Sequence, residues 1–338
     1  MGTMGKAVNL ALQGGGAHGA FAWGVVDRLL EDERISFEGI CATSAGAMNA
    51  AAMAYGLTTG GREGAKHTLA KFWRRVSEAS AWSPLQNPFL GPLTQIHIEN
   101  SPAFLAFDML TRLLSPYQFN PLNYNPLRVV LEETIDFERL REQNVVKLFV
   151  CATNVRTGKV KIFENHELTV SAVLASGCLP LLFQAIEIDG EAYWDGGYMG
   201  NPAIFPLIYG CRSTDVIVIH INPIVREEIP RTASDILNRL NEISFNSSLM
   251  REMRAIAFVN KLIGSGALRD DEMKSVLVHA IEAEAFMKDL GVASKLNADW
   301  DYLTHLRDVG RDCAEEWLKA NFEHLGVRST VDIRAKYL

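Results

Sequence analysis

Two short segments rich in glycine and alanine near the N-terminus constrain the fold of this chain most strongly. An apolar run over residues 8–12 leads into the glycines 14–16, and a helix-like stretch begins at Ala20. Glycines at such a junction allow a sharp turn and leave backbone amides uncovered. A second apolar run, residues 40–43, leads directly into Ser44 and an alanine-rich helix. Both segments predict strand–turn–helix units, from which parallel α/β sheets are built.

Gly14, Gly16 and Gly19 also match the G-x-G-x-x-G pattern of dinucleotide-binding folds. That pattern requires an acidic residue at the end of the next strand, about 20 residues on, to hold a ribose hydroxyl. Here the next strand ends in Ser44, and Glu38 precedes it. A phosphate-binding P-loop is also excluded, because no Gly-Lys-Ser/Thr follows the glycines. The pattern therefore favours chemistry at the serine over nucleotide binding.

The turn at Ser44 has the features of a nucleophile elbow. Such an elbow joins a strand directly to a helix, so the residues two before and two after the serine must be small. These positions hold Ala42 and Gly46. The helix that follows begins at the serine, and its N-terminal dipole favours negative charge there. The alternative is an incidental serine in a tightly packed turn.

A third segment supplies a carboxylate. Residues 184–188 and 191–194 are predicted strands joined by Asp-Gly, a signal for a two-residue hairpin. The second strand ends in Asp195, followed by Gly196 and Gly197. Alone, this sequence would indicate a plain turn. Together with the glycine loop and the serine, it indicates that the Asp195 side chain lies where another backbone segment passes closely.

In this order, the glycine loop, the serine elbow and the Asp-Gly-Gly segment resemble the patatin-like phospholipase family. A fourth segment, in which Ala175-Ser176 is followed by Pro180 and Phe183, matches the A-S-x-x-x-P-x-x-F pattern of that family. The similarity covers residues 6–222. It implies an α/β fold with three layers, α/β/α, in which helices cover both faces of a mainly parallel central sheet. His18 stands where the family often has arginine or lysine.

The resemblance also implies a role for each motif residue. Ser44 would be the nucleophile and Asp195 its partner in a catalytic dyad, with the amides of Gly14, Gly15 and Gly16 as oxyanion donors. The other motif positions, which would support the backbone, are Ala42, Gly46, Gly196 and Gly197. The implied enzyme is a lipid acyl hydrolase of phospholipase A type that works through an acyl-serine, with no metal or organic cofactor. A carboxylate with a pKa of about 4 is a weak base for a serine, so the oxyanion donors must carry much of the catalysis.

Two other functions remain open. His220 lies at the end of a predicted strand, residues 216–221, and the order Ser44, Asp195, His220 would suit a Ser-His-Asp triad esterase. The glycines before Ser44 and the Asp-Gly-Gly motif favour the dyad. The second alternative is a lipid-binding protein with the same fold and little turnover, for which alanine in place of the usual glycine at position 42 is the hint.

The composition of the chain limits the kinds of molecule that the protein can bind. The net charge of -7 argues against nucleic acid and against general attraction to anionic membranes. Five dispersed cysteines are typical of reduced thiols in a cytoplasmic protein, and we expect no signal peptide and no membrane span. The expected partner is a lipid or acyl ester substrate. A homo-oligomer and transient contact with a membrane surface stay open.

We predict a catalytic domain over residues 6–230 and a helical C-terminal extension over residues 231–338. Within the first, residues 82–127 hold seven of the twelve prolines, which excludes a continuous helix. This segment is expected to be a lid-like insertion. Its apolar stretch, residues 103–114, is predicted to be a helix that either packs on the core or faces lipid.

Overall fold

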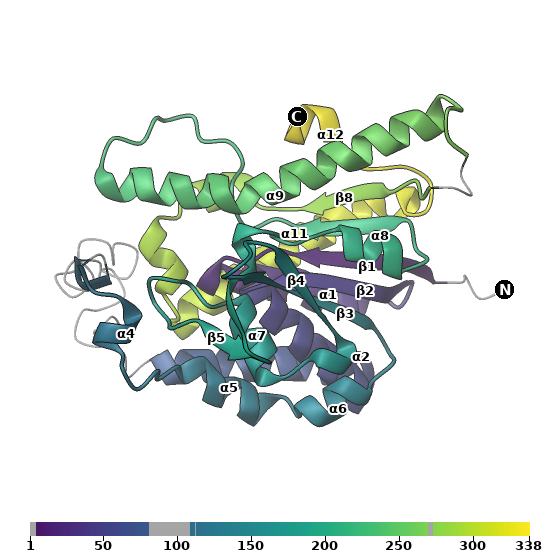
Figure 1. Cartoon of the computed structure of the whole chain (residues 1–338). Coiled ribbons are helices and arrows are strands. Elements are labelled where there is room, and N and C mark those ends of the chain that lie inside the picture. The colour runs from purple at the N-terminus through teal and green to yellow at the C-terminus, as the bar shows by residue number, and fades with distance from the viewer. Residues whose placement is uncertain (1–4, 81–108, 112, 270–272) are drawn as a thin grey trace.

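The computed structural model describes residues 5–80, 109–111, 113–269 and 273–338 (Figure 1). The strands are β1 (Lys6–Leu12), β2 (Ile35–Thr43), β3 (Lys147–Asn154), β4 (Val160–Glu164), β5 (Ile186–Ile188), β6 (Glu191–Asp195), β7 (Asp215–Ile219) and β8 (Leu277–Ile281). The helices are α1 (Gly19–Glu31), α2 (Ala45–Ser80), α4 (Pro116–Phe119), α5 (Pro126–Thr134), α6 (Phe137–Glu142), α7 (Val170–Ser176), α8 (Phe205–Gly210), α9 (Ala233–Gly264), α10 (Glu284–Lys288), α11 (Trp300–Asn321) and α12 (Ile333–Tyr337).

The described strands form one sheet in the order β5-β6-β3-β2-β1-β7-β8, and β4 pairs with β3 outside this path. β1 pairs in parallel with β2 and β7, β2 with β3, and β7 with β8. The antiparallel pairs are β3 with β4, β3 with β6, and β5 with β6. The mainly parallel sheet expected from the sequence is confirmed. Each predicted strand is present, with shifted ends.

Side chains of the parallel strands alternate between two apolar cores, one on each face of the sheet. Leu10 and Ile40 belong to the first core, whereas their neighbours Ala11 and Cys41 belong to the second. Helices α1, α2 and α11 complete the first core, and α8, α9 and α12 complete the second. Figure 1 shows α8 and α9 on one side of the sheet and α1, α2 and α5 on the other. Burial on both faces explains why these strands are continuous apolar runs.

The alanine-rich helix predicted after Ser44 is the first part of the long helix α2. Its backbone is non-helical at Gly60 and Gly61, in its middle. Gly61 has a φ of 61°, which glycine adopts at little cost. Most of the predicted apolar helix over residues 103–114 lies outside the described residues, so its role stays a prediction.

The region after residue 230 is not purely helical, which corrects the expectation from the sequence. Strand β8 extends the sheet beside β7; it is short and carries His279 at its centre, so its apolar signal is weak. Helix α11 packs on α1 with close backbone contact. A Cβ on Gly24 would lie 1.9 Å from the Arg307 carbonyl oxygen, and one on Gly310 would lie 2.1 Å from a carbonyl oxygen of α1. The domain boundary at residue 230 itself stays a prediction.

Candidate active site

The pairing of β3 brings the serine turn and the Asp-Gly-Gly segment together. On one edge of β3, Thr43 of β2 pairs with Cys151. The next residue of β3, Ala152, pairs with Asp195 of β6. Strand β4 occupies the other edge of β3 over these positions, so β6 takes the edge that β2 leaves when the chain turns at Ser44. Residues about 150 positions apart in the chain thereby become neighbours.

Ser44 has the backbone conformation of a sharp strand-to-helix turn. Its φ of 55° lies in the left-handed region, which a residue other than glycine adopts only under constraint. The Ser44 amide donates to the Ser176 hydroxyl at 2.8 Å. Its carbonyl accepts from the Met48 amide at 3.2 Å, in the first turn of α2. These bonds hold the serine at the N-terminus of α2.

Close backbone contacts explain the small residues around the turn. A Cβ on Gly46 would lie 2.6 Å from the Leu12 carbonyl oxygen, and one on Gly14 would lie 2.6 Å from the Ser44 Cβ. A Cβ on Gly196 would lie 2.2 Å from a carbonyl oxygen of β3. Glycine is therefore required at these three positions. Ala42 is fully buried, and its methyl group belongs to the first core.

Asp195 is a buried carboxylate with one oxygen engaged. Its side chain is almost completely buried, and Oδ1 accepts from the Gly197 amide at 2.7 Å. Among the described residues, Oδ2 has no hydrogen-bond partner. Burial raises the pKa of Asp195 to about 7, although the Gly197 amide and the nearby Ser44 hydroxyl both lower it. A carboxyl with this pKa is a much better proton acceptor than the ordinary aspartate assumed from the sequence.

The three amides of the glycine loop differ in their hydrogen bonding. The Gly14 amide donates to Asn201 Oδ1 at 2.7 Å and is therefore engaged. The amides of Gly15 and Gly16 donate to none of the described residues. Gly14 itself abuts Ser44, because a Cβ on Gly14 would lie 2.6 Å from the Ser44 Cβ.

A buried polar network holds the glycine loop, and the sequence reasoning missed it. The Gln13 side chain accepts from the amides of Ile221 and Asn222 at 2.8 and 3.0 Å. Its Nε2 donates to the Asn201 carbonyl at 3.2 Å and to Asn246 Oδ1 at 3.3 Å. The sequence pattern indicates Ser176 only as part of the family motif and does not indicate its bond to the Ser44 amide. Uncharged polar residues at the ends of apolar runs are the one local signal for such a network.

His220 lies in a different environment from Ser44 and Asp195. Its Nε2 is 2.5 Å from the hydroxyl of Tyr337, and the two rings stack. Burial lowers the pKa of His220 to about 3. The structure therefore brings Ser44 and Asp195 together and pairs His220 with the C-terminal helix α12, which disfavours the triad.

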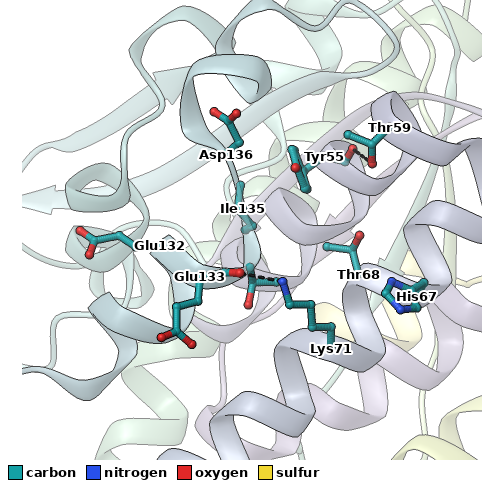
Figure 2. A pocket seen from close by; sticks show the side chains of 10 residues that line it. Tyr55, Thr59, His67, Thr68, Lys71, Glu132, Glu133, Ile135 and Asp136 are labelled. Atoms are coloured by element: carbon teal, nitrogen blue, oxygen red, sulfur yellow. Dashed lines mark hydrogen bonds between the residues drawn. The ribbon is translucent and has the colours of Figure 1, made fainter.

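A separate surface cleft of about 610 Å³ lies between α2 and the α5–α6 segment (Figure 2). Its wall includes His67 and Lys71 from α2, and Glu132 and Asp136 from the other side. Lys71 donates to the carbonyl of Glu133 at 2.7 Å across the cleft. No residue of the predicted site lines it.

The family model for patatin-like phospholipases matches residues 10–208, which is more than half of the chain. The chain belongs to the patatin-like phospholipase family. Membership implies lipid acyl hydrolase activity for this patatin-like protein. Among solved structures, it is similar to VipD from Legionella pneumophila, with a TM-score of 0.44 and 15% identity over 93% of this chain and 67% of that chain. The search of curated proteins finds no match.

In the part of the chain that the structure describes, no helix combines the length and the apolar character that crossing a bilayer requires.

Proposed function

We propose that this patatin-like protein hydrolyses acyl esters of lipids, in the manner of a phospholipase A, with Ser44 as nucleophile and Asp195 as base. One observation carries the proposal. A buried carboxylate with an unbonded oxygen lies beside a serine that is held in a left-handed turn at a helix N-terminus. A general base works best when its pKa is near the working pH, and the pKa of about 7 for Asp195 meets this condition.

In the first half of the reaction, the Ser44 hydroxyl attacks the ester carbonyl carbon while Asp195 accepts its proton. The carbonyl oxygen becomes an oxyanion, for which the amides of Gly15 and Gly16 are the proposed donors. Each such donor typically lowers the barrier by about 3 to 4 kcal/mol. The intermediate then collapses, the C–O bond to the alcohol breaks, and the alcohol leaves with the proton from Asp195. The product is an acyl-serine and a free alcohol.

In the second half, a water molecule attacks the acyl-serine while Asp195 accepts a proton from it. The same amides serve the second oxyanion. When the intermediate collapses, the Ser44 oxygen leaves and takes the proton back from Asp195. The fatty acid is released and both side chains return to their starting states.

The proposed substrate is a lipid met at a membrane surface in the cytoplasm. Apolar side chains exposed on the N-terminal half of α9 and nearby support contact with aggregated lipid. They are Ile229, Ile236, Leu237, Leu240 and Ile243. With a net charge of -7, such contact would depend on apolar transfer and not on general electrostatic attraction.

The test combines turnover with labelling of the serine. The parent protein should release p-nitrophenol from p-nitrophenyl butyrate and react with a fluorophosphonate probe. Ser44→Ala should lose both and keep a cooperative thermal melt. Ser77→Ala, on the far part of the same helix, is the matched control and should behave like the parent. Hydrolysis that survives in a folded Ser44→Ala variant would overturn the assignment, and lipid binding by a parent that neither turns over nor labels would favour the lipid-binding alternative.

A further inference from the structure

The proposed oxyanion loop is held by two side chains from distant parts of the chain. Asn222, just beyond β7, donates from Nδ2 to the Gly14 carbonyl oxygen at 2.7 Å. Its Oδ1 accepts from the ammonium of Lys295 at 3.1 Å. Lys295 lies in the short 3₁₀ helix η5 (Val292–Leu296). A line of two hydrogen bonds therefore runs from the C-terminal region to the loop.

The Gly14 carbonyl matters because it shares a peptide group with the Gly15 amide. In a planar trans peptide the C=O and N–H bonds point in opposite directions. A donor fixed on the Gly14 oxygen therefore fixes the direction of the Gly15 N–H, one of the two free donors of the loop. The same bond polarises the peptide, which strengthens the N–H as a donor. The Gly14 amide is fixed independently by Asn201.

Lys295 and the Gly14 carbonyl together set the orientation of the Asn222 side chain. An ammonium donates and never accepts, whereas a side-chain amide has one end of each kind. With Lys295 on one side, the oxygen of Asn222 must face the lysine and the nitrogen must face Gly14. Without the ammonium, the Asn222 oxygen loses its donor, and the side chain loses one of the two bonds that hold it against the Gly14 carbonyl.

The segment that carries Lys295 is packed directly on the loop. A Cβ on Gly16 would lie 2.4 Å from the Lys295 carbonyl oxygen. His18 Nε2 is 2.7 Å from the Ser294 hydroxyl. Arg226 and Glu242 nearby pair with each other at 2.7 Å. Burial lowers the pKa of Lys295, and the charge of Glu242 opposes that shift.

We propose that Lys295 and Asn222 are positioning residues that orient the Gly14–Gly15 peptide toward the oxyanion of the reaction. The inference rests on the proposed function, because it assigns a task to the loop only if an oxyanion forms there. It also gives the C-terminal region a part in catalysis, although the family match ends at residue 208.

The experiment compares Lys295→Met, Lys295→Arg and Asn222→Asp with the parent on p-nitrophenyl butyrate. Lys295→Met should lower kcat about 10- to 100-fold and leave KM within about twofold, since an oxyanion donor acts in the transition state and not on bound substrate. Lys295→Arg keeps a donor and should recover most of kcat. Asn222→Asp places an acceptor against the Gly14 carbonyl and should be the slowest. Lys288→Met, the same substitution on α10, is the matched control and should behave like the parent.

A second measurement separates positioning from a general loss of structure. A trifluoromethyl ketone binds the serine as a hemiketal oxyanion, so its affinity should fall by the same factor as kcat/KM across the variants. Thermal melts should stay close to that of the parent. Lys295→Met with parent kcat and parent inhibitor affinity would overturn the inference, as would a loss that Lys295→Arg does not recover. A parent protein with no turnover and no inhibitor binding would instead refute the proposed function itself.

Discussion

Replacing Asp195 with asparagine should abolish hydrolysis and at the same time stabilise the fold at neutral and alkaline pH. Asparagine keeps an oxygen that can accept from the Gly197 amide, which bonds Oδ1 at 2.7 Å in the parent. It has no charge to bury and no basic oxygen to accept the serine proton. The substitution therefore removes the cost of ionising a buried carboxyl together with the function of that carboxyl.

The sign and the size of this effect on the free energy of unfolding follow from the pKa of Asp195. Burial raises the pKa of Asp195 from its usual 3.8 to about 7 in the folded protein. Between these two values the unfolded chain has already lost the proton that the folded protein still holds. The free energy of unfolding of the parent therefore falls as the pH rises through this window, and it levels off above about pH 7. At about 1.4 kcal/mol per pKa unit, the full cost is on the order of 4 kcal/mol.

The assay is urea unfolding of the parent and Asp195→Asn at a series of pH values from 4 to 8. The difference in the free energy of unfolding should widen from near zero at the acid end to about 4 kcal/mol in favour of the variant at the alkaline end. Ser44→Ala is the control, because it is equally inactive but keeps the carboxylate. Since the Ser44 hydroxyl lowers the pKa of Asp195, this variant should lose at least as much stability with rising pH as the parent. A difference between parent and Asp195→Asn that does not change with pH would refute the raised pKa.

Three further predictions test the site and the packing. On a soluble ester, kcat/KM should rise with pH and level off above about pH 7, because only ionised Asp195 accepts the Ser44 proton; a flat profile from pH 5 to 9 would exclude this base. His220→Ala should keep most of the turnover and lower the melting temperature, because its partner lies on α12, whereas an inactive variant with the parent's melt would favour the triad. Gly24→Ala should lower the free energy of unfolding by more than about 2 kcal/mol in urea titrations, since its methyl group would meet the Arg307 carbonyl at 1.9 Å; an unchanged midpoint would contradict the described contact of α1 with α11.

Local sequence patterns, namely apolar runs and the residue types that follow them, were enough to predict the sheet and candidate residues at its edge. Parallel strands buried on both faces are short apolar runs, and each ends in a residue type that the turn requires. Ser44 ends such a strand, whereas Asp195 ends the antiparallel strand β6 and became a candidate only together with the glycine loop, the serine and the order of the family motifs. The weak strand β8 escaped prediction, because five residues with a histidine at the centre do not stand out from a loop.

The sequence by itself determined the order of the strands up to β7, the glycines of the turns, and the serine and aspartate as the chemical candidates. Only the tertiary structure decided that β6 follows the edge of β3 vacated by β2, which places Asp195 beside Ser44. It also decided the pKa of Asp195, because burial depends on everything packed around the carboxyl. The bonds from Lys295 through Asn222 to the glycine loop connect residues 73 and 208 positions apart. A sequence pattern reports preferences over a few residues, whereas these contacts form only when the folded sheet brings distant segments together.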